Sequence, residues 1–413
     1  MRRFKSSGPT TNLIRCLLLL CLGALPLVCQ AADSNNNPSP VAYVYTGSSI
    51  PHGHFAYNYL TGFAVAADGS AQALPGFPVS GPSRLLTAAA GHIFGAGGPC
   101  GQFVATYTAG SSGSLTESST LNVDDYLPGN NCYQLSIYAL NPDREGRFFN
   151  IVMSCGSCNS QILPFRIAPD GVLSLSGLVQ GGGAKWGGEF IFSPDDRYAY
   201  TYPYSAFPSE YKPQANGMLT FVSVLRPPPP PPPGQQQICL SGDMAASVKG
   251  YMAMTWWGDQ YWCGQYSNGY ELGNYTVNAQ GQLGLVPGPG IVPAVEEYAM
   301  AFDPTGTYLA IAGATNFNDP PEEAGIQVFK LQSDGTLVAT GPPVSAPGLR
   351  ALYSVAWDNS NHVYAVGNSF YEGCNDPCGL YIFNANDGVL TAAPGSPHAV
   401  DGVMDLAVSP TQQ

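Results

Sequence analysis

Short alternating segments, separated by turns that contain glycine, dominate the pattern of hydrophobic and polar positions in this 413-residue chain. Residues 62–66, 326–330 and 380–384 alternate with a period of two, which is typical of half-buried β-strands. These strands are followed by a turn residue and Gly, usually with Leu two positions later. The motif occurs seven times, at Gly69, Gly113, Gly171, Gly217, Gly281, Gly335 and Gly388. We expect a hairpin turn at each copy, because glycine readily adopts the positive φ that tight hairpins need.

A second hairpin pattern lies between consecutive copies of the glycine motif. Residues 191–200 and 301–311 show it most clearly, as strand, tight turn and strand. Weaker versions occur at 87–94, 138–142, 256–258 and 356–365. The glycine copies are about 53 residues apart on average, so each period holds four strands. Four-stranded units at such a period are typical of β-propeller blades.

The sequence therefore predicts an all-β fold, a seven-bladed β-propeller with four-stranded antiparallel blades. Residues 402–410 supply an innermost strand with no second hairpin, and residues 41–45 supply its missing partner. We expect the N- and C-terminal strands to pair in one blade and close the ring, which also hides strand edges.

Composition excludes several other classes of protein. Only 10% of residues are charged, and there are 49 glycines and 37 prolines, which argues against a mostly helical chain. A hydrophobic content of 45% argues against disorder. The net charge of −13 argues against a nucleic-acid or anionic-membrane partner.

The N-terminus has the features of a secretory signal peptide. Four cations (Arg2, Arg3, Lys5 and Arg15) precede a short apolar run over 16–28, and small residues follow at Ala31 and Ala32. We assign 1–31 as signal peptide, 32–40 as a flexible segment and 41–413 as the propeller, which contains a proline-rich inserted loop at 226–237. The apolar run is shorter than a membrane span. We therefore expect a secreted or periplasmic monomer, whose net charge falls to −17 once the four cations are removed.

Eight cysteines remain after the predicted cleavage. In an oxidising compartment an even number favours disulfides, and short separations favour four pairs. These are Cys100 with Cys132, Cys155 with Cys158, Cys239 with Cys263, and Cys374 with Cys378. A zinc site formed by Cys155, Cys158, Cys374 and Cys378, or a redox C-x-x-C, is the alternative, although no histidine lies close to these cysteines in the sequence.

Other possible ligand sites have simpler structural explanations. His52 and His54 could offer two nitrogens to a metal, but no third ligand lies nearby. The acidic stretch 318–323 lacks the alternating oxygen ligands of a calcium loop. Trp256 and Trp257 could stack on a carbohydrate, although aromatic packing between blades is the commoner use. We expect no metal and no cofactor.

Four segments carry a resemblance to a known family: 62–79, 192–200, 302–309 and 386–397. In these segments the chain resembles the seven-bladed, 6-phosphogluconolactonase-like lactonase family, with kinship to YVTN-type repeats. The resemblance covers the chain from about residue 41 onward. It implies a propeller with a site at the central channel. The family has a Pro-Arg-His triplet before a Phe-x-Pro strand and an Asn-Glu pair after the next strand. Here these slots hold Gly187-Gly188-Glu189 and Pro203-Tyr204.

Alignment of the innermost strands on the Phe-x-Pro turn predicts which side chains share one level of the channel. The aligned residues are Arg84, Ile137, Glu189, Met252, Ala299, Ser354 and Asp405. Lactone hydrolysis needs a carboxylate to activate water and a cation to hold a carbonyl or acid group. We therefore select Glu189 or Asp405 as the base and Arg84 as the electrostatic partner, although a salt-bridge cluster in a wet channel would use the same residues. The candidate ligand-binding residues are Glu296, Glu297 and Arg350.

Two functions remain open on this evidence. The first is an exported lactonase-like propeller that hydrolyses a sugar lactone at its central channel. The second is a catalytically silent extracytoplasmic propeller that binds a small ligand or a surface protein. The proline run and the missing family triplet favour the second function.

Overall fold

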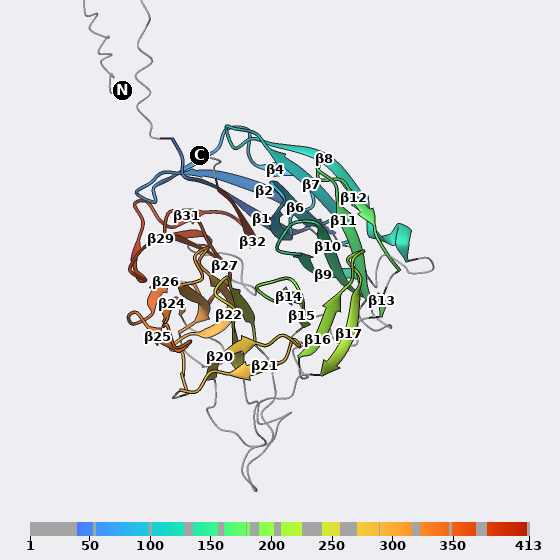
Figure 1. Cartoon of the computed structure of the whole chain (residues 1–413). Coiled ribbons are helices and arrows are strands. Elements are labelled where there is room, and N and C mark those ends of the chain that lie inside the picture. Colours follow the sequence, from blue (N-terminus) through green and yellow to red (C-terminus); the bar gives the residue numbers. More distant parts are fainter. Residues whose placement is uncertain are drawn as a thin grey trace, which may run out of the picture. The chain divides into compact units, whose positions relative to one another are not determined.

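Seven four-stranded antiparallel sheets form a β-propeller, in a computed structural model of the chain (Figure 1). The structure describes residues 39–52, 55–98, 101–127, 135–155, 161–178, 180–181, 190–201, 208–224, 242–256, 271–288, 290–315, 323–346, 349–368 and 378–410. All the blades belong to the compact unit Pro38–Gln413. No helix of these described ranges is long and apolar enough to cross a membrane.

Each blade runs from its innermost to its outermost strand in chain order, except blade 1. Blade 1 consists of β32 (Val403–Pro410), β1 (Ala42–His52), β2 (Phe55–Val65) and β3 (Ala71–Ala73), with β4 (Val79–Ser80) beside β2. Blade 2 consists of β5 (Leu85–Ala89), β6 (His92–Gly97), β7 (Phe103–Ala109) and β8 (Leu115–Asn122). Blade 3 consists of β9 (Leu135–Pro142), β10 (Phe148–Cys155), β11 (Gln161–Ile167) and β12 (Leu173–Leu175), with β13 (Gln180–Gly181) beside β11. Blade 4 consists of β14 (Phe190–Phe192), β15 (Ala199–Thr201), β16 (Ser209–Pro213) and β17 (Leu219–Val224).

The remaining blades follow the same order. Blade 5 consists of β18 (Met244–Ser247), β19 (Tyr251–Trp256), β20 (Glu271–Val277) and β21 (Leu283–Leu285). Blade 6 consists of β22 (Glu296–Phe302), β23 (Tyr308–Ala314), β24 (Ala324–Leu331) and β25 (Leu337–Ala339), with β26 (Val344–Ala346) beside β24. Blade 7 consists of β27 (Ala351–Trp357), β28 (His362–Asn368), β29 (Gly379–Asn386) and β30 (Val389–Ala392), with β31 (His398–Ala399) beside β29. A 3-10 turn, η1 (Val123–Tyr126), follows β8.

The ring closes through the two ends of the chain, as the sequence predicted. β1 pairs with β32 in antiparallel register from Ala42 opposite Pro410 to Ser48 opposite Val403. The innermost strands also contact one another in an unbroken circle, in the order β32, β5, β9, β14, β18, β22, β27 and back to β32. The predicted seven-bladed fold is therefore confirmed.

Hydrophobic packing is divided among the seams between blades. The buried hydrophobic residues of the described chain form seven clusters, and each cluster joins two neighbouring blades. In the cluster between blades 2 and 3, for example, the Phe94 and Phe149 ring centroids are 4.6 Å apart. A blade therefore buries its faces only by contact with both neighbours.

The seven predicted glycine turns hold these seams in register. All seven glycines have φ between +79° and +85°. Six of the turns lie directly on an aromatic ring of the preceding blade. A Cβ at Gly113 would lie 2.4 Å from the Tyr43 ring, and one at Gly335 would lie 2.5 Å from the Tyr251 ring. Glycine is therefore required both for its backbone conformation and for the close approach.

Hydrogen bonds from the preceding blade complete this contact. The Tyr45 hydroxyl donates to the Gly113 carbonyl at 2.9 Å, and the Tyr200 hydroxyl donates to the Gly281 carbonyl at 2.7 Å. Asn274 Nδ2 makes the same contact with the Gly335 carbonyl at 2.6 Å. We call this arrangement, a positive-φ glycine seated on the preceding blade with a hydrogen bond to the turn, the glycine latch.

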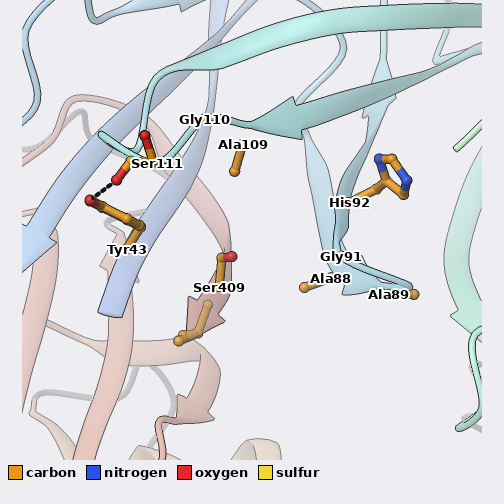
Figure 2. Close-up of a pocket in the computed structure, with 10 residues that line it drawn as sticks. Tyr43, Ala88, Ala89, Gly91, His92, Ala109, Gly110, Ser111 and Ser409 are labelled. Carbon is orange, nitrogen blue, oxygen red and sulfur yellow. Dashed lines mark hydrogen bonds between the residues drawn. The ribbon is translucent and has the colours of Figure 1, made fainter. Parts of the chain in front are cut away.

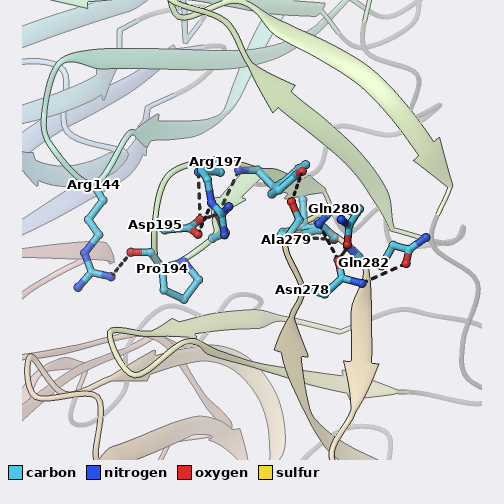
Figure 3. A network of polar contacts seen from close by, with 12 residues as sticks. Arg144, Pro194, Asp195, Arg197, Asn278, Ala279, Gln280 and Gln282 are labelled. Atoms are coloured by element: carbon cyan, nitrogen blue, oxygen red, sulfur yellow. Dashed lines mark hydrogen bonds and ion pairs between the residues drawn. The ribbon is translucent and has the colours of Figure 1, made fainter.

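Further polar contacts lie at the same end of blades 3, 4 and 5 (Figure 3). Arg144 of blade 3 donates to the carbonyl of Pro194 in blade 4 at 3.1 Å. In blade 5, Asn278 Oδ1 accepts from the backbone N–H groups of Gln280 and Gln282, both at 2.9 Å, and so fixes that turn.

We expect Gly335→Ala to destabilise the fold more than Gly76→Ala does. Both glycines have positive φ, +85° and +86°, but no atom lies within 4 Å of a Cβ at Gly76. Both variants carry the backbone cost of about 1–2 kcal/mol, and Gly335→Ala adds an overpacking cost of about 1–3 kcal/mol against Tyr251. Denaturant unfolding of both variants measures the difference, and equal losses would show that the close contact with Tyr251 contributes nothing.

Candidate functional site

The starts of the seven innermost strands form one end of the central channel, which we call the channel mouth. Equivalent hydrogen bonds join neighbouring innermost strands at two of the seams. Asp405 Oδ2 of blade 1 accepts from Leu86 N of blade 2 at 2.8 Å. Asp243 Oδ2, just before β18 of blade 5, accepts from Met300 N of blade 6.

The structure places Arg84 and Asp405 on adjacent innermost strands at the channel mouth. Arg84 is exposed, directly before β5 and two residues from Leu86. Asp405 uses its second oxygen to accept from the backbone N–H of Leu406 at 2.8 Å. Both of its carboxylate oxygens therefore accept backbone N–H groups, and the bond from Leu86 joins blades 1 and 2. Glu189, the other predicted base, lies outside the described residues.

The predicted ring of aligned residues needs correction in three blades. Met252 is a buried residue of β19, a second strand, because the innermost strand of blade 5 is β18 and its turn precedes Tyr251. Ala139, rather than Ile137, is level with Ala299, because the turn of blade 3 begins at Asp143 as that of blade 6 begins at Asp303. In blade 2 the turn has only two residues, Ala90 and Gly91. The residue level with Ala299 is therefore Leu85, one residue after Arg84.

The predicted ligand-binding residues Glu296 and Glu297 begin β22, and Arg350 directly precedes β27 in the next blade. All three are partly exposed at the channel mouth. The register of β22 shifts between Glu297 and Ala299, so Tyr298 is a bulge residue and is 44% exposed. A bulge of this kind re-aims the side chains on either side of it.

Glycine opposite the bulge lets Glu297 reach its position. Gly313 of β23 pairs with Glu297, and a Cβ at Gly313 would lie 1.7 Å from the Glu296 carbonyl oxygen. No larger residue fits there without displacing the start of β22. On the other side, a Cβ at Gly242 would lie 2.9 Å from Glu297 Oε1 and 2.2 Å from the Thr255 hydroxyl. The Glu297 side chain is thus held at the seam between blades 5 and 6.

Burial raises the pKa of Glu297 to about 8. The negative charge of Asp243 raises this pKa further, whereas a hydrogen bond with the Thr255 side chain lowers it. The burial effect dominates because little water reaches the carboxyl group, whose Oε2 atom is buried. Glu297 therefore carries a proton near neutral pH, which suits a general acid.

Sequence reasoning missed an aromatic contribution to the channel mouth. The register of β9, β22 and β27 shifts at Tyr138, Tyr298 and Tyr353 respectively. Tyr138 is 47% exposed, and the Tyr298 and Tyr353 rings meet edge to face at 5.2 Å across the seam of blades 6 and 7. All three precede the turn-starting Asp by five residues, at Asp143, Asp303 and Asp358. That spacing is the sequence signal that could have found them.

A separate hollow of about 700 Å³ lies at the opposite end of blades 1 and 2 (Figure 2). Its described lining residues include Tyr43, His92 and Ser409, and none of those described is Lys, Arg, Asp or Glu. The His92 ring nitrogens already contact the Pro169 carbonyl at 3.2 Å and the Thr108 hydroxyl at 3.3 Å. This hollow offers less acid or base chemistry than the channel mouth.

The structure tests the cysteine and metal predictions only in part. Cys378 is buried and disulfide-bonded. Cys100, Cys132, Cys158, Cys239, Cys263 and Cys374 lie outside the described residues, and only the backbone of Cys155 is described, so the four pairings stay predictions. Within the described ranges, no group of three or more His, Cys, Asp or Glu residues could hold a metal ion. His54, residues 226–237 and most of 318–323 are also outside them.

Comparison with solved structures relates the fold to lactonase propellers. The chain is similar to an inferred 6-phosphogluconolactonase from Bacteroides uniformis, with a TM-score of 0.61, 14% identity, and coverage of 89% of this chain and 99% of that chain. It is also similar to a puromycin hydrolase, with a TM-score of 0.52, 12% identity and coverage of 89% and 55%. For the periplasmic gluconolactonase of Pseudomonas aeruginosa the TM-score is 0.42, at 16% identity and coverage of 75% and 97%.

No protein-family model matches the sequence, and no curated protein matches it. At these identities the structural likeness shows the fold alone. The chain shares the β-propeller fold of the Bacteroides uniformis structure.

We expect the stability of the protein to fall, relative to Glu297→Gln, as the pH rises from about 5 to about 8. The pKa of Glu297 is about 8 in the folded chain against an ordinary value of 4.5, so the unfolded chain releases this proton first. The free energy of unfolding then decreases by up to about 1.4 kcal/mol per pH unit from this group. Denaturant unfolding across this pH range measures the effect, with Glu271→Gln as an exposed control. Parallel curves for the wild type and Glu297→Gln would contradict the assignment.

Proposed function

We propose that the protein is an exported hydrolase that opens a sugar lactone at the channel mouth, with Glu297 as the general acid. The carboxyl group of Glu297, protonated near neutral pH and held beside an exposed tyrosine, is the observation that carries this proposal. Similarity to a lactonase-like fold supports the substrate class.

The reaction requires one proton to be donated and one to be accepted. Water adds to the lactone carbonyl carbon, and the bond from that carbon to the ring oxygen breaks. The ring oxygen then takes a proton from Glu297 and becomes a hydroxyl of the product acid, while the attacking water gives a proton to a base. Glu189 is our candidate for that base. Asp405 is less suited, because both of its carboxylate oxygens already accept backbone N–H groups.

Tyrosines and arginines at the channel mouth supply the substrate contacts. A sugar ring has apolar C–H faces that pack on aromatic side chains, and the edge-to-face pair Tyr298 and Tyr353 offers such a surface. Arg84 and Arg350 provide cations that can stabilise the oxyanion formed when water attacks.

Hydrolysis of a panel of aldonolactones by the full protein tests the proposal. We expect Glu297→Gln to lower kcat about 10²–10⁴-fold, since a glutamine cannot donate the required proton. Wild-type activity should decline above about pH 8, where Glu297 loses its proton. A pH-stat assay, with the spontaneous rate subtracted, measures both effects.

The exposed Glu271→Gln, at the start of β20, is the matched control and should retain wild-type rates. Wild-type rates equal to the spontaneous rate would contradict the hydrolase proposal and favour a binding propeller. Hydrolysis that persists in Glu297→Gln would contradict only the assignment of Glu297 as the general acid.

Export of the protein is proposed from the sequence of the first 31 residues. Mass spectrometry of the mature protein from cells with an intact secretion pathway should find its N-terminus near Ala32. Recovery of the full chain from the cytoplasm would contradict export.

A further inference from the structure

A second candidate binding site lies at the end of blade 3 that carries its glycine turn, opposite the channel mouth. Two hollows, of about 400 Å³ and 310 Å³, meet at Arg147, Phe148 and Ala215. The larger hollow lies where blades 2, 3 and 4 meet, since its lining includes Ala90 of blade 2, Arg166 of blade 3 and Ala215 of blade 4. Its volume is within the range of small-ligand pockets.

Two guanidinium groups share one aromatic ring in this hollow. Arg147 Cζ lies 5.9 Å and Arg166 Cζ 5.5 Å from the centroid of the Phe148 ring. Arg147 also pairs with Asp143 at 3.3 Å and with Glu145 at 2.8 Å. None of the ion pairs found between described residues involves Arg166. The Arg166 guanidinium group can therefore pair with an anionic ligand.

Blade 6 has the equivalent contact with one cation over the ring instead of two. Lys330 pairs with Tyr308 in the register that Arg166 has with Phe148, and its Nζ lies 5.6 Å from the Tyr308 ring. A cation over the ring at this position therefore belongs to the repeat. The second guanidinium, that of Arg147, distinguishes blade 3, because Thr307 stands at the corresponding position before Tyr308 in blade 6.

The other described residues of the larger hollow are uncharged and mostly apolar: Ala90, Gly146, Phe148, Ile167, Ala168, Pro169 and Ala215. None of the described lining residues is a carboxylate, although the protein as a whole is strongly acidic. A ligand that fits this surface has one anionic group beside a small apolar body.

We propose that this hollow binds a small organic carboxylate. The carboxylate pairs with the Arg166 guanidinium, whose planar donors match two carboxylate oxygens. The apolar part of the ligand lies against Ala90, Ile167 and Ala215. Such a ligand differs from the polyhydroxylated acid that hydrolysis of a sugar lactone releases, so this site is independent of the proposed hydrolase.

Calorimetric titration of the full protein with phenylacetate, against its neutral analogue phenylacetamide, tests the proposal. We expect phenylacetate to bind at least about ten-fold more tightly than phenylacetamide, and Arg166→Gln to remove this preference. Arg166→Lys should keep part of it, because the charge remains but the bidentate geometry does not. Lys330→Gln, the matched change in blade 6, should leave binding unchanged.

Thermal unfolding of each variant separates loss of the site from loss of the fold. The proposal is wrong if neither compound binds, if both bind equally, or if a folded Arg166→Gln binds as the wild type does. It is also wrong if Lys330→Gln reduces binding to the same extent. Tighter binding of phenyl phosphate than of phenylacetate would overturn the assignment of a carboxylate.

Discussion

The glycine latch is the contact on which the propeller depends. Each blade is a twisted sheet that cannot bury its own faces, and the buried hydrophobic residues accordingly form clusters at the seams. Hydrophobic packing is not directional, so it does not by itself fix how one sheet sits on the next. A turn that contacts the preceding blade at Tyr43 or Tyr251, and receives a hydrogen bond from that blade, does fix it. Repetition of this contact from blade to blade gives seven sheets one geometry.

The contact between blades 7 and 1, where the ring closes, differs from the contacts at the other seams. Gly69, in the turn after β2, rests on Asn384 of blade 7 instead of on an aromatic ring, and Asn384 Nδ2 donates to the Asp68 carbonyl at 3.0 Å. At the equivalent aromatic position, His362 forms a buried contact of 2.7 Å with Asp358. The turn of blade 1 thus meets a polar surface where the other latches meet rings. The pairing of β1 with β32 supplies the remaining contact.

The sequence predicts what depends on local turn chemistry and misses what depends on neighbouring blades. All seven glycine turns and the closure are confirmed, because positive φ and strand alternation leave local signals. The innermost strand of blade 5 was misplaced, since Trp256 and Trp257 resemble the Phe-x-Pro pattern while the true turn has neither Phe nor Pro. The position of the Glu297 carboxyl group depends on contacts with Gly242 and Thr255 of blade 5, which no pattern within β22 reveals.

Two other carboxylates at the channel mouth have a structural role that distinguishes them from Glu297. Asp405 and Asp243 accept backbone N–H groups across the seams of blades 1 and 2 and of blades 5 and 6. These carboxylates therefore join neighbouring blades at the start of their innermost strands. Glu297 meets a side-chain hydroxyl and a second acid, and burial is the largest influence on its pKa. In a chain with few charged residues, burial therefore separates the Glu297 carboxyl group, which can donate a proton, from the carboxylates that maintain the ring.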